Sequence, residues 1–226
     1  MFDGISSKYD FLNHFLSFGA DRSWRKRVRT ELDRRSGGRF TAFSILDVAA
    51  GTGDLSLELA RGNPAEIVGI DISANMLAIA REKTAALHPG DRIRFIEGQA
   101  EHLPFDSGRF DAVTAAFGVR NFENIYRGIS EMARVLKPGG ILLILEFSHP
   151  SWFPLAQLYR FYSKAIIPRI GKWISRHEGA YSYLPASAAA FPSGRPFLDI
   201  LERNGLRNTE QIPLTGGIVS VYCAEK

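Results

Sequence analysis

Two glycines and a carboxylate stand at positions that suit the binding of a nucleotide. Gly51 and Gly53 follow a short apolar run, residues 44–49, and a helical pattern begins directly after them. Glycine permits a tight turn and leaves room for a ligand beside the backbone, and the N–H groups at a helix start favour an anionic group. Asp71 ends the next apolar run, where a carboxylate can accept hydrogen bonds from both hydroxyls of a ribose. These residues predict a site for a nucleotide-type cofactor.

The spacing within the turn leaves two such cofactors open. Dinucleotide sites use G-x-G-x-x-G, whose third glycine allows close packing of helix and strand, and Ser56 occupies that third position here. An acidic residue four positions before the first glycine, Asp47 before Gly51, resembles motif I of class I S-adenosylmethionine-dependent methyltransferases. The turn therefore favours a methyltransferase over a dinucleotide enzyme, and over a strand–turn–helix that binds nothing.

Residues after the second and third predicted strands could hold an adenine ring. The side-chain amide of Gln99 could accept from the adenine amino group, and the Ala100 N–H could donate to the ring. Ile72 and Met76 could pack against the ring faces. Each also has a simpler explanation, because a loop glutamine is often solvated and an apolar residue is often core.

Arg120 and Asn121 stand just past the fourth predicted strand, where a substrate must meet the cofactor. Surface arginines are common, so the position alone does not demand a catalytic role. His149 lies three residues after Glu146, near the expected site, and could act as a general base or simply face solvent. The five histidines show no metal-site spacing, and the sequence has no nucleophile elbow or P-loop. We therefore expect no metal cofactor.

The elements that must position these residues alternate in type from residue 44 onward. Strands are predicted at residues 44–49, 66–71, 92–97, 109–115 and 140–147, and helices at 54–61, 74–87 and 123–136. A further helix is predicted at 196–204, and two final strands, 206–212 and 217–224, are close enough to pair antiparallel. Alternation of this kind predicts a mostly parallel sheet whose ligands bind at the carboxyl ends of the strands. The residues at or just past those ends are Gly51, Asp71, Gln99, Ala116 and Glu146.

Further helices flank this core. One is predicted over residues 2–17, and a second begins at Asp21 as its N-cap. The second helix carries an apolar stripe of Trp24, Val28 and Leu32 among basic residues that are solvated or attract anionic lipid. We expect one domain with four parts: N-terminal helices (1–36), a cofactor-binding core (44–147), a lid or substrate insertion (150–192) and a C-terminal helix with strands (193–226).

The composition is ordinary for a soluble globular protein. The 226 residues suit a single domain, with 45% hydrophobic residues and a formal net charge of +4. The single cysteine, Cys223, excludes an internal disulfide and fits the reducing cytoplasm. No apolar run approaches the ~20 residues that span a bilayer, and the first residues lack a signal-peptide pattern. We therefore expect a cytoplasmic protein.

Longer motifs resemble the ubiquinone/menaquinone biosynthesis C-methyltransferase family. The first signature is YDFLNHFLS at residues 9–17 with Trp24 downstream, and the second is RVLKPGGILLILEFS at residues 134–148. Shorter matches are FGVRN at 117–121, PRIG at 168–171, YSYL at 181–184 and LTGGIV at 214–219, so the resemblance spans nearly the whole chain. Three positions depart from the family pattern: Leu12 replaces methionine, Asp21 stands in place of histidine, and Ala116 replaces a frequent serine.

The resemblance implies a Rossmann-like class I methyltransferase fold, with a mostly parallel seven-stranded sheet, an antiparallel last strand, and N-terminal and lid helices. It also implies S-adenosylmethionine as methyl donor, S-adenosylhomocysteine as product, and cofactor contacts from Thr52, Asp71, Gln99, Ala100 and Ala116. With the residues argued above, the expected cofactor-binding set is Asp47, Gly51, Thr52, Gly53, Asp71, Ile72, Met76, Gln99, Ala100 and Ala116.

The implied reaction is methylation of a ring carbon of a prenylated quinol, demethylmenaquinol or the ubiquinol precursor. We expect Arg120 to stabilise the quinolate, Asn121 and Tyr9 to orient the ring or a water molecule, and His149 to be a weaker candidate for the base. We expect no nucleic-acid partner. Residues 151–176 could touch the cytoplasmic membrane or form a homodimer face. The alternatives left open are a nicotinamide-dependent oxidoreductase, a non-catalytic partner subunit, and a methyltransferase for another small molecule.

Overall fold

The structure, a computed structural model, describes residues 19–87, 92–150 and 187–226 of the chain. Seven strands form one sheet in the order β3-β2-β1-β4-β5-β7-β6. They are β1 (Ser44–Val48), β2 (Glu66–Asp71), β3 (Ile93–Glu97), β4 (Phe110–Ala116), β5 (Leu136–Phe147), β6 (Arg207–Leu214) and β7 (Val219–Glu225). Strands β1 to β5 pair in parallel, and β7 is antiparallel to both of its neighbours. The predicted sheet, mostly parallel with an antiparallel last strand, is confirmed.

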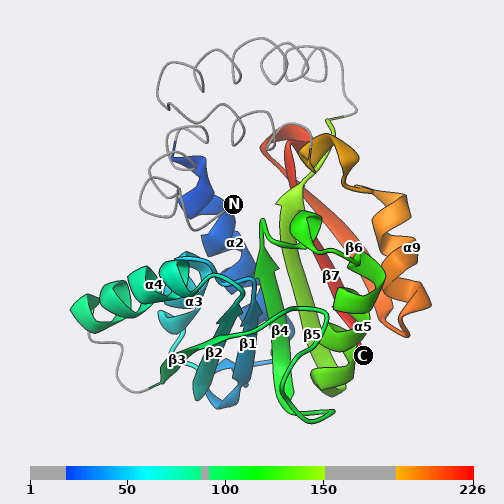
Figure 1. Cartoon of the computed structure of the whole chain (residues 1–226). Coiled ribbons are helices and arrows are strands. Elements are labelled where there is room, and N and C mark those ends of the chain that lie inside the picture. The colour runs from blue at the N-terminus through cyan, green and yellow to red at the C-terminus, as the bar shows by residue number, and fades with distance from the viewer. Residues whose placement is uncertain (1–18, 88–91, 151–186) are drawn as a thin grey trace, which may run out of the picture.

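Helices pack against both faces of the sheet, so the fold has three layers (Figure 1). The helices are α2 (Ala20–Arg35), α3 (Asp54–Ala60), α4 (Ala74–Leu87), α5 (Ile125–Val135) and α9 (Arg195–Arg203). All five residues of β1 are buried, and successive ones serve opposite layers. Ile45 belongs to the apolar cluster that includes α2, α3 and α4, whereas Leu46 belongs to the cluster that includes α5 and α9. The period of two along a strand explains this division.

Most element bounds agree with the sequence patterns to within two residues, and three of the differences have local reasons. Gly19 is the N-cap of α2, so the prediction that Asp21 caps this helix is wrong, and Asp21 lies in the first turn instead. Helix α5 begins two residues later than predicted, where the Asn124 side chain accepts a hydrogen bond from the Arg127 N–H (3.0 Å). Strand β5 begins at Leu136 rather than residue 140, because its glycine-rich start is accommodated by a register shift opposite β4.

The helix predicted over residues 2–17, which includes Tyr9, and the candidate lid and contact segment 151–176 lie outside the described residues. Within the ranges that the structure describes, no helix is both long enough and apolar enough to cross a bilayer.

Candidate functional site

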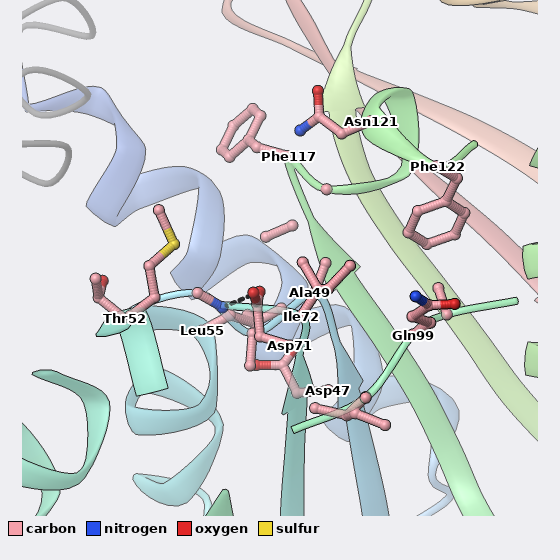
Figure 2. Close-up of a pocket in the computed structure, with 18 of the residues that line it drawn as sticks. Asp47, Ala49, Thr52, Leu55, Asp71, Ile72, Gln99, Phe117, Asn121 and Phe122 are labelled. Carbon is pink, nitrogen blue, oxygen red and sulfur yellow. Dashed lines mark hydrogen bonds between the residues drawn. The ribbon is translucent and has the colours of Figure 1, made fainter. Parts of the chain in front are cut away.

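A cavity of about 250 Å³ lies at the carboxyl ends of β1, β2, β3 and β4 (Figure 2). This is the edge at which parallel α/β sheets bind their ligands. Nine of the ten predicted cofactor-binding residues line it: Asp47, Gly51, Thr52, Asp71, Ile72, Met76, Gln99, Ala100 and Ala116. They come from four separate strand ends, so the fold brings together residues that are up to about seventy positions apart in the sequence.

The tenth residue, Gly53, is not among the lining residues because it closes the packing beneath the turn. Its φ is 81°, a backbone conformation that favours glycine. A Cβ added there would lie 2.9 Å from Cζ of Phe95 and 3.0 Å from Cβ of Ala80. Gly53 therefore lets the start of α3 approach β3 and α4, and so supports the turn that lines the cavity.

The carboxylate of Asp71 is held from two sides at the end of β2. Its Oδ2 accepts the Gly51 N–H (2.8 Å), and its Oδ1 accepts the Ser73 N–H (2.9 Å). Figure 2 shows the first of these bonds, with Asp71 facing the glycine turn. A carboxylate has about four lone-pair sites, so it can accept hydrogen bonds from ligand hydroxyls as well as from backbone N–H groups. This fixed orientation suits recognition of a ribose diol.

Asp47 is the most deeply buried acidic residue of the cavity wall. It is 1% exposed, and its carboxylate accepts hydrogen bonds from Ser56 Oγ (2.6 Å) and Thr114 Oγ1 (3.1 Å). Burial raises the pKa of Asp47 to about 7, and the two hydroxyl bonds lower it only in part. A group with this pKa responds to a positive charge placed in the cavity, because such a charge favours its ionised form.

The cavity wall also carries large apolar side chains. Ile72 is 62% exposed, which is unusual for a large aliphatic side chain that lines a cavity. Met76 lines the same cavity, as does Phe122 beyond β4. Figure 2 shows Thr52 and Gln99 on opposite sides of Asp71. An apolar ring next to Ile72 and Gln99 would cover surface that is otherwise exposed to water.

The residues after β4 form the remaining wall, and their backbone is strained. Phe117 lines the cavity with φ 57°, and Ala49 lines it with φ 54°, both in the left-handed region that non-glycine residues rarely adopt. A Cβ on Gly118 would overlap Cβ of Ala49, so only glycine permits these two loops to touch. Such strain is often found at binding sites.

Asn121 lines the cavity, but its neighbour Arg120 does not. Arg120 Nη1 donates to Oε1 of Glu146 (2.9 Å), and its backbone N–H donates to Oε2 of the same residue (3.3 Å). The two side chains are 3% and 0% exposed. The guanidinium also lies 5.2 Å from the centre of the Phe147 ring. Arg120 is thus directed into the wall of the cavity, where it fixes the turn that presents Asn121.

His149 is exposed, and it is not among the residues that line the cavity. No cluster of three or more histidine, cysteine or acidic side chains that could hold a metal ion occurs among the described residues.

Several lining residues were not predicted to contribute to the site, namely Arg25, Ala49, Asp54, Glu101, Phe117, Phe122 and Glu123. Phe117 stands within a motif quoted for the family, which was a usable signal. No signal in the sequence distinguishes Arg25, because it is one of five basic residues around the apolar stripe of α2.

The three-layer fold and the cavity above the glycine turn define this chain as a class I methyltransferase in architecture. A solved S-adenosylmethionine-dependent methyltransferase from Thermotoga maritima shares the fold, with a TM-score of 0.65 and 16% identity, covering 100% of this chain and 98% of that one. Residues 1–226 match the family described as the ubiE/COQ5 methyltransferase family. The chain therefore belongs to the ubiE/COQ5 methyltransferase family, as the resemblance predicted, and is an S-adenosylmethionine-dependent methyltransferase.

Two relatives illustrate how similar the chain is to other members. It is 43% identical to the demethylmenaquinone methyltransferase of Bacteroides fragilis, covering 100% of this chain and 91% of the relative. It is 44% identical to the ubiquinone/menaquinone biosynthesis C-methyltransferase UbiE of Geotalea daltonii, covering 100% of this chain and 94% of the relative. This membership decides against the nicotinamide-dependent oxidoreductase that the turn had left open.

Proposed function

We propose that the chain transfers the methyl group of S-adenosylmethionine to a ring carbon of demethylmenaquinol, with the corresponding ubiquinol precursor as a second substrate. One observation carries the proposal. The cavity joins a polar side, around Asp71 and Asp47, to a side lined by Phe117 and Asn121. The polar side suits the donor, and an aromatic side with one amide suits a quinol ring. The names of the relatives, which include demethylmenaquinone methyltransferase, support the choice of quinol.

The reaction needs alignment more than activation of the donor. When bound, S-adenosylmethionine supplies an electrophilic methyl group, and its transfer breaks the C–S bond as the new C–C bond forms. The protein must hold the ring carbon in line with that bond, which can contribute roughly 7–11 kcal/mol. Removal of the proton from a ring hydroxyl raises electron density at the carbon, and a base can add about 10²–10⁴-fold. The proton of the methylated carbon then leaves and restores the aromatic ring.

We assign direct contact with the quinol to Asn121, whose side chain lines the cavity and can hydrogen-bond a ring hydroxyl. The buried pair of Arg120 and Glu146 positions that turn, and the carboxylate neutralises most of the arginine's field at the ring. This role replaces direct stabilisation of the quinolate by Arg120. Tyr9 remains our candidate for a second orienting group, and His149 for a proton acceptor.

The direct test is a transfer assay with S-adenosylmethionine labelled in the methyl group. Demethylmenaquinol and the benzoquinol precursor are offered side by side to the purified protein. We expect label in the ring of demethylmenaquinol, and in the benzoquinol if the second substrate is accepted. If neither quinol becomes labelled while the protein binds S-adenosylhomocysteine, the donor site is intact and the assignment of substrate is wrong.

We also propose that the protein acts in the cytoplasm at the membrane surface, because a prenyl tail keeps the quinol in the bilayer. Residues 151–176 are our candidate contact, since their sequence has an apolar face with basic residues opposite. Co-sedimentation with liposomes of wild-type protein and the Trp152→Glu variant tests this directly. Equal binding of the two proteins would remove the proposal. Size-exclusion chromatography of the same variant tests the alternative, a homodimer formed through this segment.

A further inference from the structure

Two cations from different helices meet beside the glycine turn, at the end of the cavity near Thr52. Arg25 of α2 lines the cavity, and its Nη2 lies 3.4 Å from Oδ2 of Asp54. Lys83 of α4 donates to Oδ1 of the same carboxylate (2.8 Å) and to Thr52 Oγ1 (3.1 Å). Asp54 therefore holds both positive groups at one end of the cavity.

Arg25 is less exposed than the basic residues next to it on α2. Its side chain is 14% exposed, whereas Arg22 and Lys26 on the same helix are exposed. Nη2 of Arg25 also donates to Oδ2 of Asp21, one helical turn earlier (2.6 Å). A guanidinium has five N–H donors, and within the described ranges this bond to Asp21 is the one hydrogen bond that Arg25 donates. Its remaining donors can reach a ligand at this end of the cavity.

The two ends of the cavity differ in chemistry, and the difference orients the donor. Asp71 is placed to hold the ribose, and Gln99 and Thr52 lie on opposite sides of it (Figure 2), so an adenine ring near Gln99 puts the rest of the donor toward Thr52. The amino-acid end of S-adenosylmethionine must then extend toward Thr52, and this end carries a carboxylate. Arginine binds carboxylates through two parallel N–H···O bonds, which adds direction to the charge attraction.

We propose that Arg25, held in place by Asp21 and Asp54, binds the α-carboxylate of the methyl donor. This inference rests on S-adenosylmethionine being the donor. Lys83 adds a second positive charge, and Asp54 keeps the two cations together when the site is empty. Helix α2 thereby supplies a binding residue for the donor, in addition to covering the sheet.

Binding of two ligands that differ only in this carboxylate tests the assignment. Isothermal titration would compare S-adenosylmethionine with its decarboxylated form, for the wild type and for the Arg25→Met, Arg25→Lys and Lys26→Met variants. We expect Arg25→Met to weaken binding of S-adenosylmethionine about tenfold to hundredfold and to leave the decarboxylated ligand almost unaffected. Arg25→Lys should give an intermediate loss of affinity, because lysine keeps the positive charge but cannot form the two parallel N–H···O bonds. Lys26→Met is the control, since Lys26 is exposed and outside the cavity lining.

An equal loss of affinity for both ligands in the Arg25→Met and Arg25→Lys variants would overturn the inference, because it would indicate a purely structural role. Unchanged affinity for S-adenosylmethionine would overturn it as well. Failure of the wild type to bind S-adenosylmethionine would instead overturn the proposed function, and this inference with it. The wild-type titration therefore separates the two failures.

Discussion

The hydroxyl of Ser56 donates a 2.6 Å hydrogen bond to Oδ2 of Asp47, inside the wall of the cavity. Ser56 is 0% exposed and lies on α3, so the bond joins the helix after the glycine turn to the strand before it. Thr114 of β4 donates to the other oxygen of the same carboxylate (3.1 Å). The carboxyl group of Asp47 is thus held by two hydroxyl groups, while burial raises its pKa to about 7.

Donor binding should depend on the protonation of Asp47. The sulfonium and ammonium charges of S-adenosylmethionine favour the ionised carboxylate, so binding should lower the pKa of Asp47 and release a proton. We expect affinity to rise as the pH passes upward through about 7, by up to tenfold per pH unit below that value. Titrations in buffers of different ionisation enthalpy measure the released proton directly.

Two variants serve as controls for that dependence. Asp47→Asn should bind the donor more weakly and without the pH dependence. Ser56→Ala removes a bond that lowers the pKa of Asp47, so the pH at which affinity rises should be higher in this variant.

The carboxyl group of Asp47 also affects stability, because its pKa of about 7 in the folded protein exceeds its value of about 4 in the unfolded chain. The free energy of unfolding should therefore fall as the pH rises between these values. An unchanged pH profile in Asp47→Asn would contradict the assignment.

Replacing Asp71 with Asn should weaken donor binding about tenfold to hundredfold. An amide has one acceptor oxygen, so it cannot serve the N–H groups of Gly51 and Ser73 and two ribose hydroxyls as a carboxylate can. Glu97→Gln is a matched control, because Glu97 pairs with Asp71 in register on β3 but is exposed and outside the cavity lining. Equal affinities of the two variants for S-adenosylhomocysteine would contradict a ribose-binding role.

Replacing Arg120 with Ala should lower the free energy of unfolding by about 3–5 kcal/mol, because it leaves the charge of Glu146 buried without its partner. Turnover should fall much more than donor affinity, because the turn that positions Asn121 loses the ion pair between Arg120 and Glu146. Glu146→Gln should reduce turnover in the same way. Thermal unfolding and single-turnover kinetics measure the two effects.

The exposed pair of Lys137 and Asp111 provides the comparison for this buried pair. Its side chains are 43% and 25% exposed, so Lys137→Ala should cost no more than about 1 kcal/mol and leave turnover unchanged. If Arg120→Ala turned over normally, neither a positioning nor a direct catalytic role for Arg120 would stand.

Gly118→Ala should destabilise the protein by about 1–3 kcal/mol and weaken donor binding. The added methyl would overlap Cβ of Ala49 and push apart the loops that follow β1 and β4. Gly205→Ala is the control for destabilisation without the loop contact, because at φ 79° the added methyl group strains the backbone but meets no neighbouring atom, so donor affinity should be unchanged. Chemical denaturation and titration with S-adenosylhomocysteine check both variants. Comparable losses of affinity in the two would show that the loop contact is unimportant.

The sheet and the residues at its strand ends that line the cavity could be predicted because their signals are local. Strand β2 and helix α4 have the bounds that the apolar patterns predict, since a buried strand and an amphipathic helix each carry their own period. Asp47 and Asp71 could be located because they stand at fixed distances from a turn that glycine makes recognisable. Ser56 was interpreted only as a missing glycine, and its bond to Asp47 depends on how α3 packs against β1.

The parts that escaped prediction depend on pairings between distant elements. Arg120 was correctly placed at the end of β4, but its direction depends on Glu146, which reaches it only because β5 lies beside β4. Arg25 could not be distinguished from Arg22 or Lys26, because its approach to the cavity depends on the packing of α2 on α3. Residue type gave no hint in either case.

The order of the last two strands has a consequence for how the protein is made. Strand β6 reaches the sheet only through β7, which lies between β6 and β5 and follows β6 in the chain. While the ribosome is still adding residues 219–225, the apolar edge of β5 has no neighbour on that side. Such an edge is a template for pairing with other chains. Nascent chains that stall before β7 should therefore be the species that most needs a chaperone.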